Sequence, residues 1–263
     1  MAEPPSPAAN PPASGAASQK IDEIPAPPNV EIATNPTTLP SGAAPASTGT
    51  TSPPPTPQPS EAEAAEAAKL AASLQTAAQA GDHPSEYRLA ILYALGKGVT
   101  RDYDKAAALM RRAADAGLPE AEYDYGVLAD KGLGMPKNAV EAVRWYTKAA
   151  QKGHPPAQLN LGYAYAEGLG VNRNLPEAAK WFRRAAEAGL INAEFNLAYM
   201  YEQGAGVTKS PVEAFAWYSL AAERGDQGAQ EALDRMAPNL TDKEKASGKA
   251  RAAIIRKSIK AQG

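Results

Sequence analysis

Small and apolar residues recur along this chain at a fixed interval of 36 residues. Five glycines, each 36 residues after the one before, mark the interval: Gly81, Gly117, Gly153, Gly189 and Gly225. Between these glycines, the same kinds of apolar residue return at the same places in successive units. Self-similarity with a fixed period of this length is typical of a solenoid, whose units each pack only against their neighbours. No unit is expected to be stable alone.

The third unit shows how one repeat is expected to fold. Ala157, Leu161 and Tyr165 are spaced four apart and therefore lie along one helical face, and Gly168 suits the left-handed residue that ends a helix. After a short connector, Pro176 is placed to begin a second helix, because a proline in the first turn loses no hydrogen bond. Each unit is therefore predicted to be a hairpin of two helices, which we name helix A and helix B.

The apolar columns of the repeat predict a core shared by all units. They contain a leucine and a tyrosine in helix A and a tryptophan in helix B, which a pair of alanines follows. The predicted core residues are Leu89, Tyr93, Trp145, Leu161, Tyr165, Trp181, Leu197, Tyr201 and Trp217. Truncation of Trp181 to alanine is expected to cost about 3 to 5 kcal/mol because it would leave a cavity.

The pattern resembles the Sel-one-like repeat (SLR), a relative of the tetratricopeptide repeat. The third unit reads AQLNLGYAYAEGLGV and AAKWFRRAAEAG, and the fourth reads AEFNLAYMYEQGAGV and AFAWYSLAAERG. The resemblance covers residues 81 to about 236; Ala129 replaces the tyrosine, Leu109 replaces the tryptophan, and Ala90 and Ala198 replace a helix A glycine. It implies an all-α, right-handed α-solenoid similar to tetratricopeptide stacks. It also implies an adaptor or regulatory protein of a largely bacterial class that acts in the envelope, in secretion or in signalling.

The repeat pattern and its edges predict the domain organisation. Four full repeats are expected at 81–116, 117–152, 153–188 and 189–224, and a half repeat ends at 237. Residues 61–80 are expected to form an N-terminal capping helix, and 238–263 a basic C-terminal helix; both begin with a capping box, at Ser60 and at Thr241. The C-terminal helix is expected to cover the last hairpin, or else to be a basic arm for an acidic partner, anionic lipid or nucleic acid.

Residues 1–60 differ from the rest of the chain in composition. They contain 16 of the 24 prolines and no aromatic residue, so they are expected to form a disordered leader, either a spacer or a docking site for a proline-recognising domain. No signal peptide or membrane span can be read in the chain. A cytoplasmic protein is expected if Met1 is the true start, and a periplasmic or cell-envelope protein if a signal or anchor precedes it.

The composition offers little for catalysis or for metal binding. The chain has no cysteine and only two histidines, His83 and His154, both in turns between units. The Gly-x-Gly pairs do not follow strands, so we expect tight helix connections and not phosphate loops. With a net charge of −2, nucleic acid is not an expected partner of the whole chain. We expect no catalytic residue, no metal and no cofactor.

The surface of the stack is therefore where a function is expected. Helix A columns opposite the core leucine are predicted to face a partner, and the resemblance implies that helix A lines the concave wall. The candidate partner-binding residues are Arg88, Asp124, Asn160, Tyr163, Asn196 and Tyr199. Packing between repeats is the alternative role for the asparagines and tyrosines.

The expected function is a non-enzymatic adaptor or scaffold that binds a peptide or helix of a partner protein in the concave groove. One alternative is an envelope-associated structural or localisation protein tethered by the proline-rich leader. The other is a regulator that sequesters a sensor or an enzyme.

Overall fold

The computed structural model describes residues 60–261, which form helices and no strand. The expectations for the leader before Ser60 lie outside this range. The helices are α1 (Glu61–Gln79), α2 (His83–Leu95), α3 (Tyr103–Asp115), α4 (Pro119–Lys131), α5 (Ala139–Gln151), α6 (Pro155–Glu167), α7 (Leu175–Glu187), α8 (Ile191–Gln203), α9 (Pro211–Glu223), α10 (Gln227–Met236) and α11 (Asp242–Lys260), with a 3-10 turn, η1 (Ala237–Asn239), between the last two.

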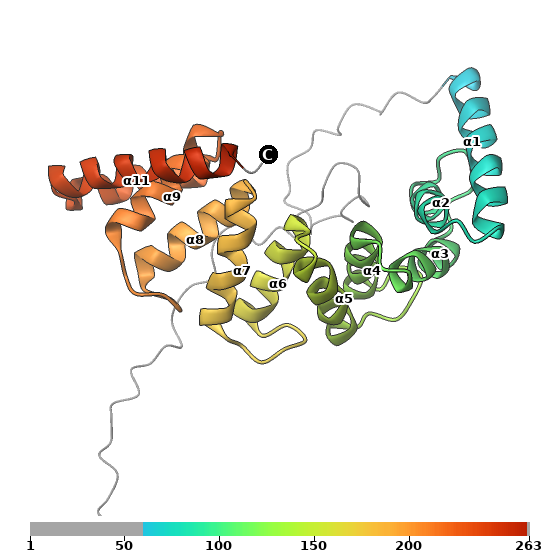
Figure 1. Ribbon diagram of the computed structural model, residues 1–263, viewed down its shortest axis with the longest axis horizontal. Helices are drawn as coiled ribbons and strands as arrows, with labels where there is room; N and C mark the ends of the chain where they lie inside the picture. Colours follow the sequence, from blue (N-terminus) through green and yellow to red (C-terminus); the bar gives the residue numbers. More distant parts are fainter. Residues whose placement is uncertain (1–59, 262–263) are drawn as a thin grey trace, which may run out of the picture.

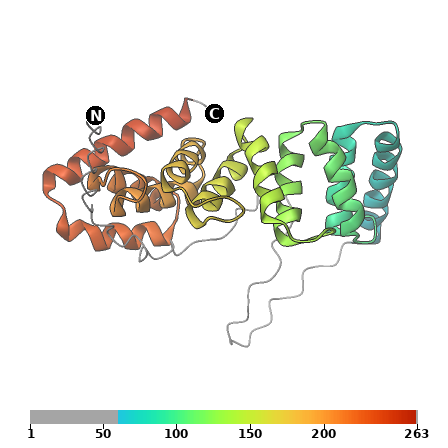
Figure 2. The ribbon, with the colours of Figure 1, turned by 90° about the horizontal axis from the view of Figure 1, so that it is seen from below.

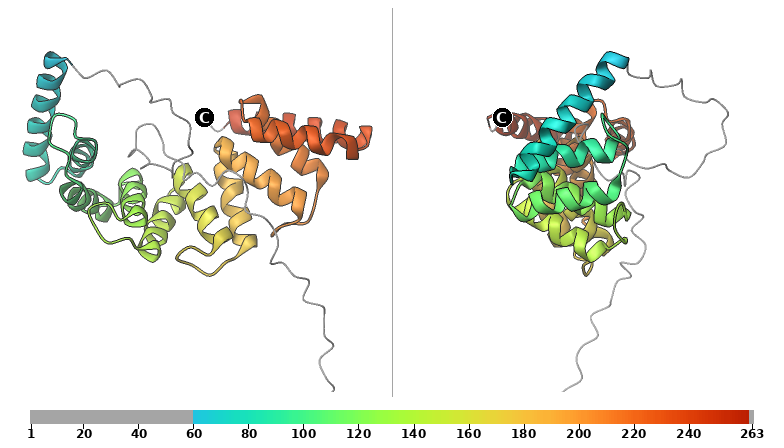
Figure 3. Two further views of the ribbon diagram at one scale, coloured as in Figure 1. Left: turned by 180° about the vertical axis from the view of Figure 1, so that it is seen from behind. Right: turned by 90° about the vertical axis from the view of Figure 1, so that its right-hand side faces the viewer.

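Successive helices form hairpins that stack into a solenoid, as the repeat predicts. Helix A of the units is α2, α4, α6 and α8, and helix B is α3, α5, α7 and α9. The stack is a curved arc with α1 at one end and α11 at the other (Figure 1). Seen from below, the helices of neighbouring units lie side by side in chain order (Figure 2). Both terminal helices rise on the same side of the curve (Figure 3).

Each hairpin begins and ends at residues whose side chains or backbone suit the position. The four B helices start after Asp102, Asn138, Asn174 and Ser210, and each of these side chains accepts a hydrogen bond from the backbone N–H three residues later. This is the preferred N-cap chemistry. The A helices end at glycines in the left-handed conformation, for example Gly168 at φ 74°. The Gly-x-Gly pairs are therefore helix connections.

Two glycines of the third unit show why the helices approach so closely. A Cβ at Gly162 would lie 2.6 Å from the ring of Phe182, and a Cβ at Gly170 would lie 2.4 Å from the carbonyl oxygen of Ala139. The first contact presses helix A onto helix B of the same unit. The second presses the connector onto the first turn of the preceding helix B. Any other residue would push these elements apart.

The core contains most of the predicted residues. Leu89, Trp145, Leu161, Leu197 and Trp217 are buried. The remaining four are half-buried and lie at the edge of the core: Tyr93, Tyr165, Trp181 and Tyr201.

In the third unit, the buried aromatic ring is Phe182 and not Trp181. Phe182 faces Gly162, and one residue along a helix turns the side chain by about 100°. The Trp181 ring is instead covered by the guanidinium of Arg184, 4.6 Å from its centroid.

Buried acidic residues join helix A to the B helices that flank it. Glu122 accepts a hydrogen bond from Lys152 at 2.7 Å, and Glu194 from Arg224 at 3.0 Å. Glu86 is paired with Arg112 in the first unit. The third unit has a neutral Gln158 at this position, and it donates to the carbonyl oxygen of Ala150 at 3.2 Å.

The C-terminal helix α11 packs along α9 and covers the end of the stack. Gly248, Ala252 and Ile255 form its buried stripe, and a Cβ at Gly248 would lie 2.7 Å from the ring of Phe215. Arg251 pairs with Glu213 at 2.7 Å. Both capping boxes form, at Ser60 and Thr241. The helix is therefore folded back.

Candidate functional site

The row of residues expected to face a partner is mostly buried. Arg88 is exposed and Tyr199 is half-buried, as an open surface requires. In contrast, Asp124, Asn160, Tyr163 and Asn196 are each at most 4% exposed. The expectation that this whole row faces solvent is thus wrong for those four. The cause is the packing of each A helix against the A helices on both sides, which covers every residue at 121–129 and at 156–164.

Hydrogen bonds from one A helix to the next account for three of the buried residues. The Tyr87 hydroxyl donates to Asp124 Oδ2 at 3.0 Å, and Asn196 Nδ2 donates to the Tyr163 hydroxyl at 2.7 Å. Tyr163 also packs edge-to-face on Phe182. Burial raises the pKa of Asp124 to about 7, although the bond from Tyr87 opposes this rise. These residues link neighbouring units.

Asn160 is different, because its amide is buried without a hydrogen-bond partner. Neither Nδ2 nor Oδ1 makes a hydrogen bond within the described residues. The amide does lie close enough to the Tyr146 hydroxyl to oppose the rise in the pKa of this tyrosine that burial causes. An unpaired amide in the interior costs about 1 to 3 kcal/mol. Such a cost is typical of a group kept for a ligand and not for stability.

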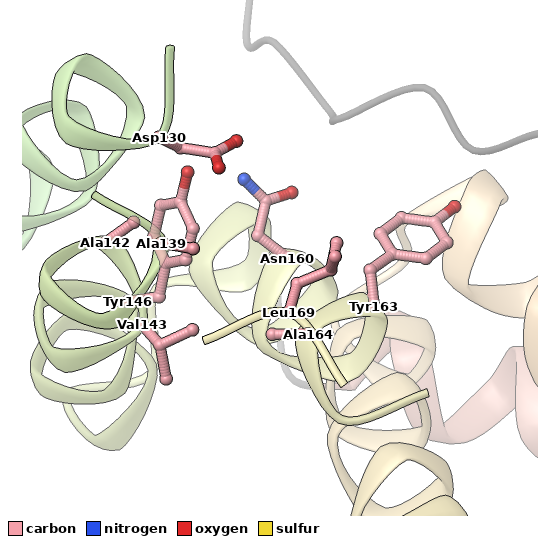
Figure 4. A pocket seen from close by; sticks show the side chains of 9 residues that line it. All are labelled: Asp130, Ala139, Ala142, Val143, Tyr146, Asn160, Tyr163, Ala164 and Leu169. Atoms are coloured by element: carbon pink, nitrogen blue, oxygen red, sulfur yellow. The ribbon is translucent and has the colours of Figure 1, made fainter. Parts of the chain in front are cut away.

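The Asn160 amide lies at a cavity of about 130 Å³ between the second and third units. Figure 4 shows that the carboxylate of Asp130 and the hydroxyl of Tyr146 lie beside this amide at one end. The walls are apolar and come from α5, α6 and the connector after α6. The remaining lining residues are Ala139, Ala142, Val143, Tyr163, Ala164 and Leu169.

Two exposed apolar side chains lie at the same place. Leu169 is 52% exposed and Val140 is 66% exposed. They are neighbours because Gly170 is pressed against the backbone of Ala139 and Val140. Exposed large apolar residues that cluster beside a cavity are typical of binding sites.

Sequence reasoning missed Asp130, Tyr146 and Leu169 as site residues. Tyr146 belongs to an aromatic pair that the repeat pattern assigns to the core. Asp130 has no counterpart that repeats, and Leu169 lies within a Gly-x-Gly connector. A residue that breaks the repeat by placing a large apolar side chain between two glycines is the one signal that the sequence offered.

The two histidines have structural roles. His154 Nδ1 accepts a hydrogen bond from the N–H of Ala157 at 3.3 Å and so caps α6. Burial lowers the pKa of His154. His83 lies beside the buried carboxylate of Glu86, at 2.9 Å. Among residues 60–261, no group of three or more histidine, aspartate or glutamate side chains could hold a metal ion.

No helix in the described part of the chain is both long and apolar enough to cross a membrane.

Comparison with known proteins finds the Sel1 repeat four times in succession, at residues 83–118, 119–154, 155–190 and 191–226. Each match begins two residues after the corresponding unit assigned above. A search of curated proteins finds no match.

Two solved structures are similar to this chain. A protective antigen of uropathogenic Escherichia coli that displays an SLR fold is 33% identical, with a TM-score of 0.63 over 72% of this chain and 40% of its own. A Sel1 repeat protein from Oxalobacter formigenes is 35% identical, with a TM-score of 0.60 over 65% of this chain and 49% of its own. The chain therefore spans less than half the length of both.

Sel1 repeat proteins are generally scaffolds for protein–protein interaction and are typically non-catalytic. Four consecutive matches cover more than half of the 263 residues, and the hairpin stack has the corresponding fold. The chain belongs to the Sel1 repeat family.

Proposed function

We propose that this protein is a non-enzymatic adaptor that binds an extended segment of a partner protein along the A helices of its second and third units. The observation that carries the proposal is the unpaired amide of Asn160, which is 4% exposed and opens onto the cavity beside Tyr146. One carboxamide offers a donor and an acceptor, which match the N–H and C=O groups of an extended backbone.

The surroundings of Asn160 support a peptide as the ligand. The cavity walls are apolar and can take a side chain, and Leu169 and Val140 offer further apolar contact at the surface. Arg88 and Tyr199, which are not buried, lie at the corresponding column of α2 and near it on α8. These residues would extend the contact beyond the cavity. Curved helical stacks commonly bind extended segments in this way.

The test is selection of a random peptide library, displayed on phage, against the full chain. Enriched peptides are then measured by fluorescence anisotropy against the parent and against Asn160→Leu, which keeps the shape of the side chain but removes its amide. We expect affinity to fall at least about tenfold, since each lost hydrogen bond contributes roughly 1 kcal/mol. The thermal midpoint should stay the same or rise, because an unpaired buried amide disappears.

A matched control is Asn239→Leu, at an exposed asparagine of η1 distant in sequence from the A helices of the second and third units. It should leave the affinity unchanged. The proposal fails if no peptide is enriched, or if enriched peptides bind Asn160→Leu as tightly as the parent.

A further inference from the structure

The polar end of the cavity contains more hydrogen-bond acceptors than an apolar side chain would need. The Asp130 carboxylate, the Tyr146 hydroxyl and the Asn160 amide lie together there (Figure 4). Tyr146 and Asn160 leave their buried polar atoms without a hydrogen bond in the described residues. Asp130 takes part in none of the ion pairs of the described chain.

The other end of the cavity is shaped for a methylene chain. Val143, Ala164 and Leu169 present only carbon atoms from their side chains, and Ala139 and Ala142 complete the wall. A volume of about 130 Å³ is enough for one side chain and not for a larger group. The ligand that fits is therefore long, narrow and apolar, with a hydrogen-bond donor at its tip.

We propose that this cavity binds the side chain of a lysine from the partner segment, with the ammonium group held by Asp130, Tyr146 and Asn160. An ammonium has three N–H donors and no acceptor, and the cavity has three acceptor groups: a carboxylate, a hydroxyl oxygen and an amide oxygen. The amide oxygen can face the ammonium because the terminal torsion of an asparagine is broad. The methylene stem lies against Val143, Ala164 and Leu169.

Lysine fits better than arginine for a geometric reason. A guanidinium is planar and binds carboxylates with two parallel hydrogen bonds, whereas an ammonium is compact and donates in three directions. The three acceptor groups come from α4, α5 and α6 and so approach from different sides. The negative charge of Asp130 supplies the complementary charge at the end of the cavity.

This inference rests on the proposed function, because it names the chemistry of the bound segment. Its test needs no natural partner. The ¹⁵N-labelled full chain is titrated with N-acetyl-lysine methylamide and, separately, with N-acetyl-norleucine methylamide, which has a similar stem but no ammonium. The readout is the side-chain NH₂ signal of Asn160, assigned by its absence in Asn160→Leu.

We expect a saturable shift with the lysine probe and a response at least about tenfold weaker with the norleucine probe, since a charge-assisted hydrogen bond contributes about 1.5 to 3 kcal/mol. Asp130→Asn should weaken lysine binding to a similar extent. Asp104→Asn, which removes the same charge from an exposed position on α3, should have no effect.

Equal responses to the two probes, no shift with lysine, or full binding by Asp130→Asn would each overturn the lysine assignment. Such a failure is distinguishable from failure of the proposed function. In that case, selected peptides would still bind the parent and lose affinity for Asn160→Leu.

Discussion

At the scale of single residues, the buried acidic column shows how the units tolerate charge in their interior. Glu86, Glu122 and Glu194 each face a cation from a B helix, and the third unit has Gln158 instead. Two of the cations, Lys152 and Arg224, are 36 and 72 residues apart from each other's columns in the expected register, and the same column contains Ala188 in the third unit. The loss of the cation and the loss of the carboxyl group therefore occur together.

This pairing makes Gln158→Glu a specific test. A carboxylate there would be buried with no cation placed to meet it, because Arg184 lies over the Trp181 ring. The variant should lose at least about 2 kcal/mol of stability at pH 7.5. The loss should shrink towards pH 5, where the raised pKa of the new carboxyl group lets it bind a proton. Urea denaturation at both pH values measures this.

The control for that prediction is the double variant Gln158→Glu with Ala188→Arg. It restores the arrangement of Glu194 and Arg224 in the third unit and should recover most of the lost stability at pH 7.5. A single variant as stable as the parent, or a double variant no better than the single one, would contradict the pairing.

Asp124 makes stability depend on pH near neutrality. Its pKa is raised from 3.8 in the unfolded chain to about 7 in the folded protein, chiefly by burial. The folded state therefore binds the proton more tightly, so the stabilising contribution is complete below about pH 4 and is lost as the pH rises through 7. Burial also raises the pKa of Glu194 to about 7, which acts in the same direction.

Asp124→Asn should consequently flatten this dependence. The asparagine keeps an acceptor for the Tyr87 hydroxyl but carries no charge. Between pH 5 and pH 8, the parent should lose stability by about 1 to 3 kcal/mol more than the variant, as judged by urea midpoints. His154 has a lowered pKa and opposes the trend only at acidic pH. Equal pH profiles for the two proteins would show that Asp124 is charged in the folded state.

At the scale of helices, helix B shows how closely the repeat pattern specifies the packing. The pattern identifies Trp181 and Phe182 as an aromatic pair, and the structure buries the second of them against Gly162. Phe182→Ala should cost about 3 to 5 kcal/mol. Trp181→Ala should cost clearly less, because half-buried rings leave smaller cavities. Thermal melts of the two variants decide the matter; a larger loss for Trp181→Ala would reverse our assignment.

Much of the fold could be predicted from the sequence because its determinants are local. The opening glycines, the N-caps of the B helices and the capping boxes at Ser60 and Thr241 all act within a few residues. The 36-residue period then extends one hairpin to the others.

The burial of the partner-facing row could not be predicted in the same way. A helical wheel separates two faces, whereas α4 and α6 are covered from both sides by neighbouring A helices. The same column is buried as Tyr163 in α6 and half-buried as Tyr199 in α8. Asn196 of the next unit reaches Tyr163, and α10, which follows α8, is shorter and has an alanine at the column of Asn196. Position along the stack therefore decides exposure, and the repeat pattern does not contain it.

At the scale of the whole molecule, the arc has α1 at one end and α11 packed on α9 at the other (Figures 1 and 3). Both ends of the described stack are thus covered, as repeat proteins require. The cavity of Asn160 lies between the second and third of the four units. A bound segment that crosses this cavity can contact helices of several units at once, which favours an extended ligand over a compact one.

The most direct test of this account is a crystal structure of the full chain with the tightest peptide from the library selection. We predict that the peptide lies along α4 and α6, with its backbone hydrogen-bonded to the Asn160 amide and one side chain in the cavity beside Tyr146. A peptide bound on the B helices or on α11, with the cavity empty, would contradict it.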